Sequence, residues 1–383
     1  MRRTVRVASA LAAAALAVAA AGCSSGKPGH GAGAGASAGA TGGVTGGSGS
    51  GGSPGKKLTV AFLAPCSATC ANRFEQQDVR LFTQAVHEID RGVTVVADNA
   101  QGRGATQVTQ AQSALAAGAG VIVVDPVDKA SGAAVATKAK AAGVPVVSYD
   151  ALVRGARSDY YVAFDNQRAG ELQAQYLANR LPAGATVAIL NAEQSTDQGR
   201  AFKAGAHKVL DPLFASGKLR RGYEADARSA TAGTGKALTQ QAVARTGSKL
   251  AGLLAATDTL AEGAVAALST AHLSGKVALT GGGASDAGLR RLLQNTQSMT
   301  VYNAVKQEAR AAAKIAVLAG RGNAAAAKST TKTTVDSGAG QVPALLLTPI
   351  VVTSYNMGQT VLADGFTTRQ KLCTAAVKDR CPA

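Results

Sequence analysis

Short apolar runs alternate with longer amphipathic stretches along most of this 383-residue chain. The runs at 58–63, 93–97 and 121–124 are rich in Val, Leu and Ile, and a stretch with helical character follows each of them. Such runs are typical of strands that are buried on both faces of a parallel sheet and covered by the intervening helices. The pattern therefore predicts an α/β fold.

The same cycle continues to residue 352 and restarts once, after residue 180. Strands are expected at 58–63, 93–97, 121–124, 144–149, 160–164, 186–190, 219–223, 250–256, 277–280, 299–302 and 344–352. Helices are expected at 74–89, up to 117, at 135–142, after 165–166, and at 200–210, 236–245, 260–269, 289–293 and 305–318. Two successive sets of this size predict two Rossmann-like lobes with parallel sheets and a ligand cleft between them.

Polar side chains follow many of the predicted strands. The strand at 144–149 stops at Asp150, and the strand at 160–164 stops at Asp165 and Asn166. The other strand-end polar residues are Asp98, Asn99, Asn191, Thr257 and Asp258. Ligands of open α/β sheets bind at the carboxyl ends of the strands, where carboxylates and amides can pair with several sugar hydroxyls. For each single residue, capping of the next helix is the alternative explanation.

The first 55 residues have the composition of a targeting segment and a tether. A basic start precedes an apolar stretch at 7–21 that is too short to favour a spanning helix, and the small residues before Cys23 resemble a bacterial lipobox. We expect a lipoprotein signal peptide at 1–23 with lipidation of Cys23. The alternative is an ordinary cleavage site in a soluble secreted protein. Residues 24–55 are rich in Gly, Ala and Ser, which predicts a flexible tether.

The remaining four cysteines are expected to pair outside the cytoplasm. Our preferred pairs are Cys66 with Cys70 and Cys373 with Cys381, because each would close one loop. Four cysteines allow three connectivities, and the sequence alone does not choose between them. A zinc site is disfavoured, because the spacings are not CxxC and no histidine lies close to them in the sequence.

Composition and motifs argue against several other classes. The net charge is +17, but the basic residues are spread thinly, aromatic residues make up 4% and there is no Trp, so the pattern of a nucleic-acid-binding protein is missing. The GTGK sequence at 233–236 lacks the Ser/Thr that would bind magnesium in a phosphate loop. The histidines at 30, 87, 207 and 272 are not at predicted strand ends beside a carboxylate or nucleophile. We therefore predict no enzyme activity, no cofactor and no metal.

The segment 144–181 resembles the sugar-binding proteins of ABC importers, specifically the xylose-binding branch of the type 1 periplasmic binding proteins. The resemblance is carried by Tyr149-Asp150, by Phe164-Asp165-Asn166 and by the GELQ sequence at 170–173. Further matching segments are 267–277, 296–302, 346–350 and 361–366, so that the resemblance covers nearly all of residues 57–383. It implies three crossover segments between the lobes, near residues 164, 302 and 347.

On this resemblance the N-terminal lobe comprises 56–164 plus 303–347, and the C-terminal lobe comprises 165–302 plus 348–383. The expected ligand-binding residues, which include the strand-end residue Asn191, are Arg73, Phe74, Asp150, Asn191, Asp197, Gln198, Thr257, Asp258 and Asn303. Several sugar-contacting positions of the family differ in this chain, where they are Ala151, Gly199, Thr257, Gly282, Gly283 and Asn303. D-Xylose is therefore expected to bind poorly or not at all.

The expected function is that of an extracytoplasmic solute-binding protein of an ABC importer, anchored to the cell membrane by a lipid. Such a protein would capture a monosaccharide or related small polar ligand by hinge closure, act as a monomer and deliver the ligand to a permease. The alternative is a ligand-sensing surface lipoprotein that docks on a membrane receptor without transport. A DNA-binding repressor with the same type of core is rejected, because the chain has an export signal where a helix-turn-helix would be required.

Overall fold

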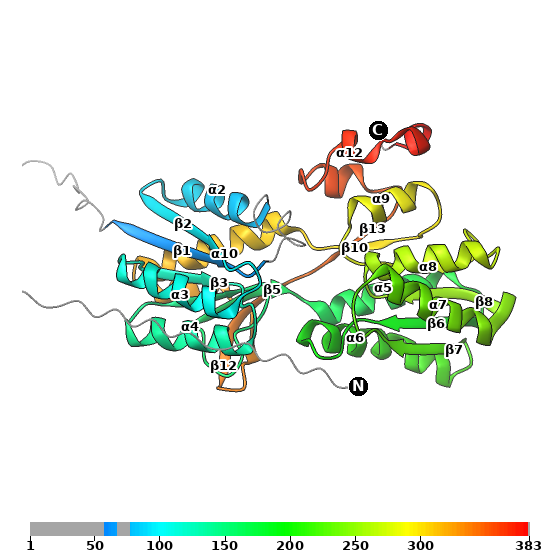
Figure 1. The fold of residues 1–383 in the computed structure, drawn as a ribbon, viewed down its shortest axis with the longest axis horizontal. Helices are drawn as coiled ribbons and strands as arrows, with labels where there is room; N and C mark the ends of the chain where they lie inside the picture. The colour runs from blue at the N-terminus through cyan, green and yellow to red at the C-terminus, as the bar shows by residue number, and fades with distance from the viewer. Residues whose placement is uncertain (1–56, 67–76, 382–383) are drawn as a thin grey trace, which may run out of the picture. The chain divides into compact units, whose positions relative to one another are not determined.

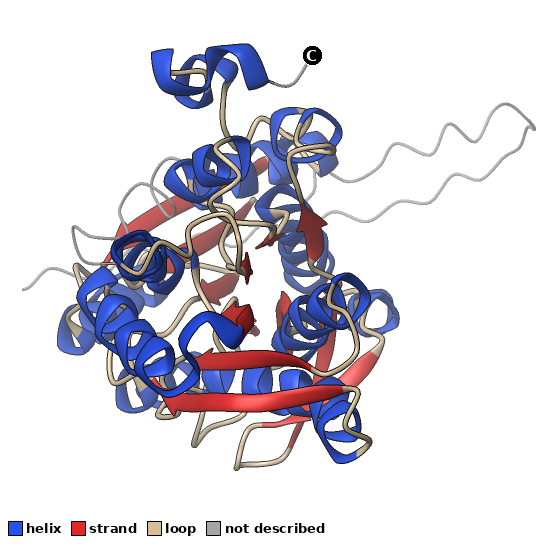
Figure 2. Cartoon of the chain, turned by 90° about the vertical axis from the view of Figure 1, so that its right-hand side faces the viewer, coloured by secondary structure: helices blue, strands red, loops and turns tan. Residues whose placement is uncertain are grey.

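Two largely parallel β-sheets with helices packed on them form the part of the chain that the structure describes (Figure 1, Figure 2). The structure is a computed structural model, and it describes residues 57–66 and 77–381. The strands are β1 (Leu58–Ala64), β2 (Val93–Asn99), β3 (Val121–Val124), β4 (Val146–Tyr149), β5 (Tyr160–Phe164), β6 (Ala185–Asn191), β7 (Leu219–Asp226), β8 (Leu250–Ala255), β9 (Ala278–Leu279), β10 (Thr300–Tyr302), β11 (Thr333–Asp336), β12 (Gln341–Leu347) and β13 (Ile350–Val352). The expected α/β fold with two lobes is confirmed.

The helices lie between the strands in the order that the sequence predicted. They are α2 (Val79–Ile89), α3 (Gly104–Ala116), α4 (Lys129–Ala141), α5 (Asn166–Arg180), α6 (Asp197–Ala215), α7 (Ala232–Thr246), α8 (Asp258–Thr270), α9 (Asp286–Leu293), α10 (Val305–Gly320), α11 (Ala324–Thr330) and α12 (Arg369–Leu372). Shorter helical segments are η2 (Gly247–Lys249), η3 (Gly358–Leu362) and η4 (Ala375–Arg380). None of the helices in the described ranges is both long and apolar enough to cross a membrane.

The first lobe is built on a seven-stranded sheet in the order β11-β12-β5-β4-β3-β1-β2. Alternate residues of β1 pack on opposite faces of this sheet. Val60 and Phe62 lie in the core with α2 and α10, whereas Ala61 and Leu63 lie in the core with α3 and α4. Because both faces are covered, the inner strands are apolar throughout, which is the pattern that predicted them.

The outer strands beside β5 come from far along the chain. β12 runs parallel to β5, with Leu347 beside Phe164, and Figure 1 shows it among elements from the first part of the sequence. The prediction of one strand-like connection at 344–352 was wrong, because β12 ends at Leu347 and β13 begins at Ile350. Pro349 lies in this break and has no N–H group to donate to a sheet. β11 and α11 were not predicted, because residues 321–336 contain no run of Val, Leu, Ile or aromatic residues.

The second lobe is built on a four-stranded parallel sheet in the order β7-β6-β8-β9. α5 packs on α6, α7 packs on α8, and both pairs contact the sheet. Glycines allow these close helix pairs. A Cβ atom on Gly205 would lie 1.8 Å from the backbone oxygen of Gln167, and one on Gly263 would lie 1.9 Å from that of Ala232. Any side chain at these two positions would push the helices apart.

The C-terminal segment packs against the second lobe. β10 and β13 form a small antiparallel sheet, and Val301 of β10 makes a bridge to Gly282. α9, η3, α12 and η4 enclose an apolar cluster that includes Leu289, Leu292, Leu293, Tyr302, Met357, Val361, Leu372 and Val377. A disulfide joins Cys373 to Cys381 in this segment, and it is the C-terminal pair that we preferred from the sequence. The chain therefore passes between the lobes after β5, after β10 and after β12. The exact residue bounds of the two lobes, which we gave from the sequence, stay predictions.

Several helices begin earlier than their apolar periodicity predicted. α4 begins at Lys129 rather than at residue 135, because Asp128 and Ser131 form a capping box. In this box the Ser131 N–H donates to Asp128 Oδ1 at 2.7 Å, and the Asp128 N–H donates to Ser131 Oγ at 3.2 Å. α6 similarly begins at Asp197 rather than at residue 200, with Thr196 as its N-cap. Capping side chains and not apolar residues fix these helix ends.

Candidate functional site

A cavity of about 340 Å³ lies at the carboxyl ends of β5 and β12, where the chain passes from the first lobe to the second. We call it the hinge pocket. It is lined by Leu152, Arg154, Tyr161, Phe164, Asp165, Asn166, Gln167, Asp197, Gln198, Arg200, Ala201, Val335 and Leu346. The carboxyl ends of parallel strands are the place at which open α/β sheets bind ligands, so the hinge pocket is the candidate site.

Two arginines hold both oxygens of the Asp197 carboxylate on the polar wall of this pocket. Arg154 donates from Nε to Asp197 Oδ2 at 2.5 Å, and Arg200 donates from Nη2 to Oδ1. Arg154 also donates from Nη1 to the backbone oxygen of Asp336 at 2.6 Å. The amide of Gln198, beside Asp197, lines the pocket without a hydrogen-bond partner among the described residues. The wall thus combines a neutralised carboxylate with an amide that can both donate and accept.

Tyr161 and Phe164 of β5 supply aromatic lining to the same pocket. The Tyr161 hydroxyl donates to the backbone oxygen of Asp150 at 3.1 Å, and burial raises the pKa of this phenol well above its usual range. Asp150 follows β4 with a φ of 57°, a left-handed backbone that few residues other than glycine adopt. Its N–H donates to the Val162 oxygen at 2.9 Å, so that the unusual turn is held by the neighbouring strand. Strained positions of this kind are concentrated at binding sites.

Asp165 both lines the hinge pocket and caps a helix. Its Oδ1 atom accepts a hydrogen bond from the Arg168 N–H at 2.9 Å, as expected for the N-cap of α5. Its own N–H donates to the Leu347 oxygen at 2.9 Å, which joins the first crossover to the last. The capping and ligand-facing explanations that we weighed from the sequence are therefore compatible at this residue.

Asp258 has an interior environment instead. Asp258 is only 3% exposed. Its Oδ2 atom accepts a hydrogen bond from the Ser285 N–H at 2.8 Å and another from the Ser285 hydroxyl at 3.0 Å. Oδ1 accepts from Gln297 Nε2 and from Thr300 Oγ1, both at 2.8 Å. Burial raises the pKa of this carboxyl group, while the hydrogen bonds act in the opposite direction. In the structure, Asp258 connects neighbouring segments of the second lobe through these hydrogen bonds. Its contact with a ligand stays a prediction.

The other expected ligand contacts of the second lobe differ in how many of their polar atoms are already hydrogen-bonded within the protein. Thr257 is the N-cap of α8, and its hydroxyl accepts from the Leu260 N–H at 3.2 Å. Asn191 is fully buried and donates from Nδ2 to Glu224 and Asp226, while its Oδ1 has no hydrogen-bond partner among the described residues. Asn303 is half-buried at the start of the second crossover. Their roles toward a ligand stay predictions.

Four of the candidate ligand-binding, lipidation and disulfide residues lie outside the described ranges. They are Arg73, Phe74, Cys23 and Cys70. Cys66, at the end of the first described range, is disulfide-bonded. Since Cys373 and Cys381 are bonded to each other, Cys66 does not pair with either of them.

Sequence reasoning did not single out Arg154, Arg200, Tyr161, Val335 or Leu346, all of which line the hinge pocket. Tyr161 lies within a predicted strand, and alternation along that strand could have indicated which face it occupies. Nothing in the local sequence marks Arg154 or Val335. Both reach the pocket because distant segments meet at the sheet edge.

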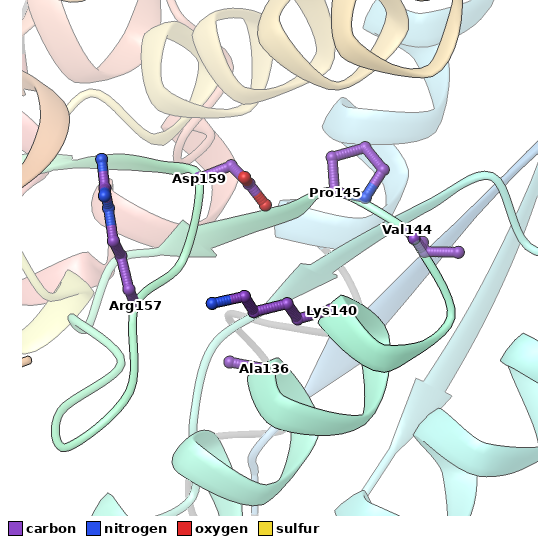
Figure 3. Close-up of a pocket in the computed structure, with 7 residues that line it drawn as sticks. Ala136, Lys140, Val144, Pro145, Arg157 and Asp159 are labelled. Carbon is purple, nitrogen blue, oxygen red and sulfur yellow. The ribbon is translucent and has the colours of Figure 1, made fainter.

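A second cavity, of about 460 Å³, lies at the amino ends of β4 and β5 in the first lobe. Figure 3 shows Lys140 of α4 pointing toward the segment that carries Arg157 and Asp159. All three residues are exposed, and this edge of the sheet is opposite to the one that carries the polar strand ends. We therefore do not assign the ligand site to this cavity.

His207 lies closer to carboxylates than the sequence suggested. Its Nδ1 lies 3.0 Å from Asp211 Oδ2, and its Nε2 lies 2.7 Å from Glu224 Oε1 at the end of β7. His207 itself lies within α6, so the prediction that no histidine sits at a strand end beside a carboxylate is not contradicted. Within the described residues no group of three or more His, Cys, Asp or Glu side chains is arranged to hold a metal ion.

The fold and the site define a two-lobed α/β binding protein, and comparison with known proteins gives its family. The model of the periplasmic binding protein domain matches residues 66–324. The chain belongs to this family. Membership implies an extracytoplasmic location.

Two curated relatives are D-xylose-binding periplasmic proteins. The chain is 34% identical to the one from Escherichia coli (strain K12) over 291 residues, which cover 76% of this chain and 86% of the relative. It is 32% identical to the one from Haemophilus influenzae over 297 residues, which cover 78% of this chain and 87% of the relative. A solved carbohydrate transporter solute binding protein from Chloroflexus aurantiacus, in complex with D-glucose, is 25% identical with a TM-score of 0.68 and covers 82% of this chain and 97% of its own.

Proposed function

We propose that this protein is the solute-binding component of an ABC importer and captures a monosaccharide or a related small polar ligand between its two lobes. The observation that carries the proposal is the hinge pocket at the carboxyl ends of β5 and β12, with aromatic and amide side chains, in a chain of the periplasmic binding protein family. Pyranose and furanose rings present apolar faces and hydroxyls, which match an aromatic wall and polar groups that donate and accept.

The relatives support a carbohydrate ligand without fixing which one. Curated relatives are named for D-xylose, and a solved relative was crystallised with D-glucose. We propose Asp150, Asn191, Asp197 and Gln198, together with Arg73 and Phe74, as ligand contacts. Thr257, Asp258 and Asn303 stay further candidates.

D-Xylose is proposed to bind weakly. A Cβ atom on Gly199 would lie 2.0 Å from the Glu193 oxygen, and one on Gly282 would lie 2.6 Å from the Ala256 oxygen. In this backbone, neither position can carry the polar side chain found in the xylose-binding branch. Each unmade buried hydrogen bond costs about 1–3 kcal/mol, so three such losses would weaken binding by about a hundredfold or more.

The test is a thermal-shift screen of the purified protein against D-glucose, D-xylose, D-ribose, D-galactose and myo-inositol, followed by titration calorimetry. A ligand that binds only the native state raises the melting temperature, by the equivalent of about 2.7 kcal/mol at a hundred times its Kd. We expect at least one sugar or polyol to do so and D-xylose to do so least. A micromolar or tighter Kd for D-xylose would contradict the second expectation, and no response to any carbohydrate would contradict the first.

The contact residues are tested with whichever compound binds. Asp150→Ala and Gln198→Ala should each weaken binding by about tenfold or more, because a buried hydrogen bond to the ligand is lost. Asp98→Ala is the matched control, since Asp98 also ends a strand but lies at the outer strand of the sheet, away from the hinge pocket. If Asp150→Ala and Gln198→Ala bound the compound with the same affinity as the control Asp98→Ala, Asp150 and Gln198 would not be ligand contacts.

The membrane anchor and the permease complete the proposal. We propose that Cys23 carries a lipid and that the protein acts as a monomer that delivers its ligand to a permease. A Cys23→Ala protein should move from the membrane fraction to the soluble secreted fraction. An unchanged distribution would contradict the lipid anchor.

A further inference from the structure

The two lobes are joined mainly by the chain itself. Among the described residues, no helix or strand of the first lobe packs extensively on one of the second, apart from the crossover segments. Two polar side-chain contacts nevertheless span the lobes. Gln77 Nε2 donates to the Phe366 oxygen at 3.2 Å, and Arg154 donates to Asp197 at 2.5 Å. The second of these joins opposite charges, so it is the stronger of the two.

Arg154 is fixed to the first lobe on both sides of its loop. The Val153 N–H donates to Ser148 Oγ of β4 at 3.2 Å, and the Gly155 N–H donates to the Ser337 oxygen beside β11 at 3.1 Å. The Arg154 side chain then bonds the Asp336 oxygen with Nη1, so that its guanidinium is held before it reaches Asp197. A guanidinium that is already oriented loses little freedom when it pairs.

Asp197 is equally fixed to the second lobe. It is the first residue of α6, and the N-cap hydroxyl of Thr196 accepts from the Gly199 N–H at 3.0 Å. A carboxylate in the first turn of a helix is also stabilised by the positive end of the helix dipole. Arg200, one turn later on α6, bonds the other carboxylate oxygen. The ion pair therefore links two rigid parts, and it forms only when the lobes are at this separation.

We propose that the Arg154–Asp197 ion pair is a latch that favours the lobe separation at which the pair forms, and that Arg154 is a positioning residue for Asp197 and Gln198. The pair lies at the rim of the hinge pocket and brings Asp197 and Gln198 toward β5. Arg154 thereby biases the equilibrium between lobe separations before any ligand binds. The inference deepens the proposed function and rests on it for its biological meaning.

The expected size of the effect follows from exposure. The side chains of Arg154 and Asp197 are 35% and 36% exposed, so that solvent and salt screen the pair. Ion pairs of this exposure shift an equilibrium by about two- to fivefold. The population at the lobe separation that the ion pair stabilises should therefore fall with rising salt concentration in the unmodified protein.

The experiment measures the separation of the lobes in the ligand-free full chain. Spin labels are placed at the exposed positions 113 on α3 and 216 after α6 through genetically encoded ketone side chains, which leave the cysteines untouched. Pulsed dipolar spectroscopy then gives the distance distribution. Arg154→Gln should lower the population at the lobe separation of this structure, relative to all other separations, about two- to fivefold and abolish its salt dependence. Arg154→Asp should lower it further because two carboxylates would then face each other.

Arg310→Gln is the matched control, because Arg310 Nη2 bonds Glu88 Oε2 at 2.7 Å within the first lobe. It should leave the distance distribution and its salt dependence unchanged. Melting temperatures check that every variant is folded. A distribution in Arg154→Asp that equals that of the unmodified protein, or an equal change in Arg310→Gln, would overturn the latch. Because no ligand is present, failure of the latch and failure of the sugar-binding proposal are separate outcomes.

Discussion

Asp165 at the first crossover and Asp258 in the second lobe both follow a buried strand and both begin a helix, yet their carboxylates have different surroundings. Asp165 lines the hinge pocket, and one of its carboxylate oxygens accepts the N-cap hydrogen bond of α5. Asp258 is buried and accepts hydrogen bonds from Ser285, Gln297 and Thr300. The same local pattern, an acidic residue after an apolar run, therefore corresponds to a pocket-lining residue at Asp165 and to a buried hydrogen-bonded residue at Asp258.

The difference follows from what covers each strand end. The loop after β9 and the start of β10 fold over the end of β8, and Gly281 and Gly288 leave room for the Asp258 carboxylate. A Cβ atom on Gly288 would lie 2.1 Å from Asp258 Oδ2. At the end of β5, by contrast, the chain crosses to the other lobe and leaves a cavity. A strand-end carboxylate can face a ligand only where the connection after the strand does not bury it.

The strongest test of this comparison is to remove the buried acceptor. Asp258→Ala should destabilise the protein by about 3–5 kcal/mol, because several buried donors would lose their partner at once. Urea denaturation measures the change. Asp98, near the end of β2, has no side-chain hydrogen bond to another described residue, so Asp98→Ala should change stability by less than about 0.5 kcal/mol. Equal effects would mean that the network around Asp258 contributes nothing.

A smaller effect is expected where glycine sets the packing of the second lobe. Gly205→Ala should cost about 2–3 kcal/mol, because the new Cβ atom would overlap the Gln167 backbone and force α5 and α6 apart. Gly233→Ala on α7 is the control, since its nearest neighbour would be 3.8 Å away, and it should stabilise the protein by up to about 1 kcal/mol. If both variants behaved alike, the close approach of α5 and α6 would not matter for stability.

Charge pairing between the same two helices, α5 and α6, should contribute less. Hydrogen bonds from Lys208 and then Arg168 hold the pKa of Glu171 at about 2, against an ordinary value of 4.5. A depressed pKa gives stability that is present above about pH 4.5 and is lost as the pH falls through about 2. Glu171→Gln should therefore cost about 1–2 kcal/mol at pH 7 and almost nothing near pH 2. A cost that did not change with pH would point to packing rather than to charge.

The smallest loss of stability is expected from the helix caps beside the two compared carboxylates, and it should be the same for both. Asp165 and Thr257 cap α5 and α8, so Asp165→Ala and Thr257→Ala should each cost about 1 kcal/mol in denaturation. Asp165→Ser and Thr257→Ser should restore most of the loss. A much larger cost for either alanine variant would show a role beyond capping.

The order of strands and helices was predictable from this sequence because strands buried on both faces are apolar runs, and their length and spacing survive without tertiary information. Helix starts were predicted less well, since side-chain caps such as Asp128 and Thr196 determine them. β11 and α11 were missed because they have no run of large apolar residues and are held by their neighbours in the sheet and the helix layer.

For the candidate site, the sequence by itself determined where polar residues follow strands, and it named Asp150, Asp197 and Gln198 near the hinge. Only the tertiary structure decided which of the strand-end residues are enclosed, as Asp258 is, and which face a cavity, as Asp165 does. It also brought Arg154 to Asp197, which lies 43 positions away along the chain. The physical reason is that burial and pairing depend on which distant segment covers a strand end, and local sequence carries no record of that segment.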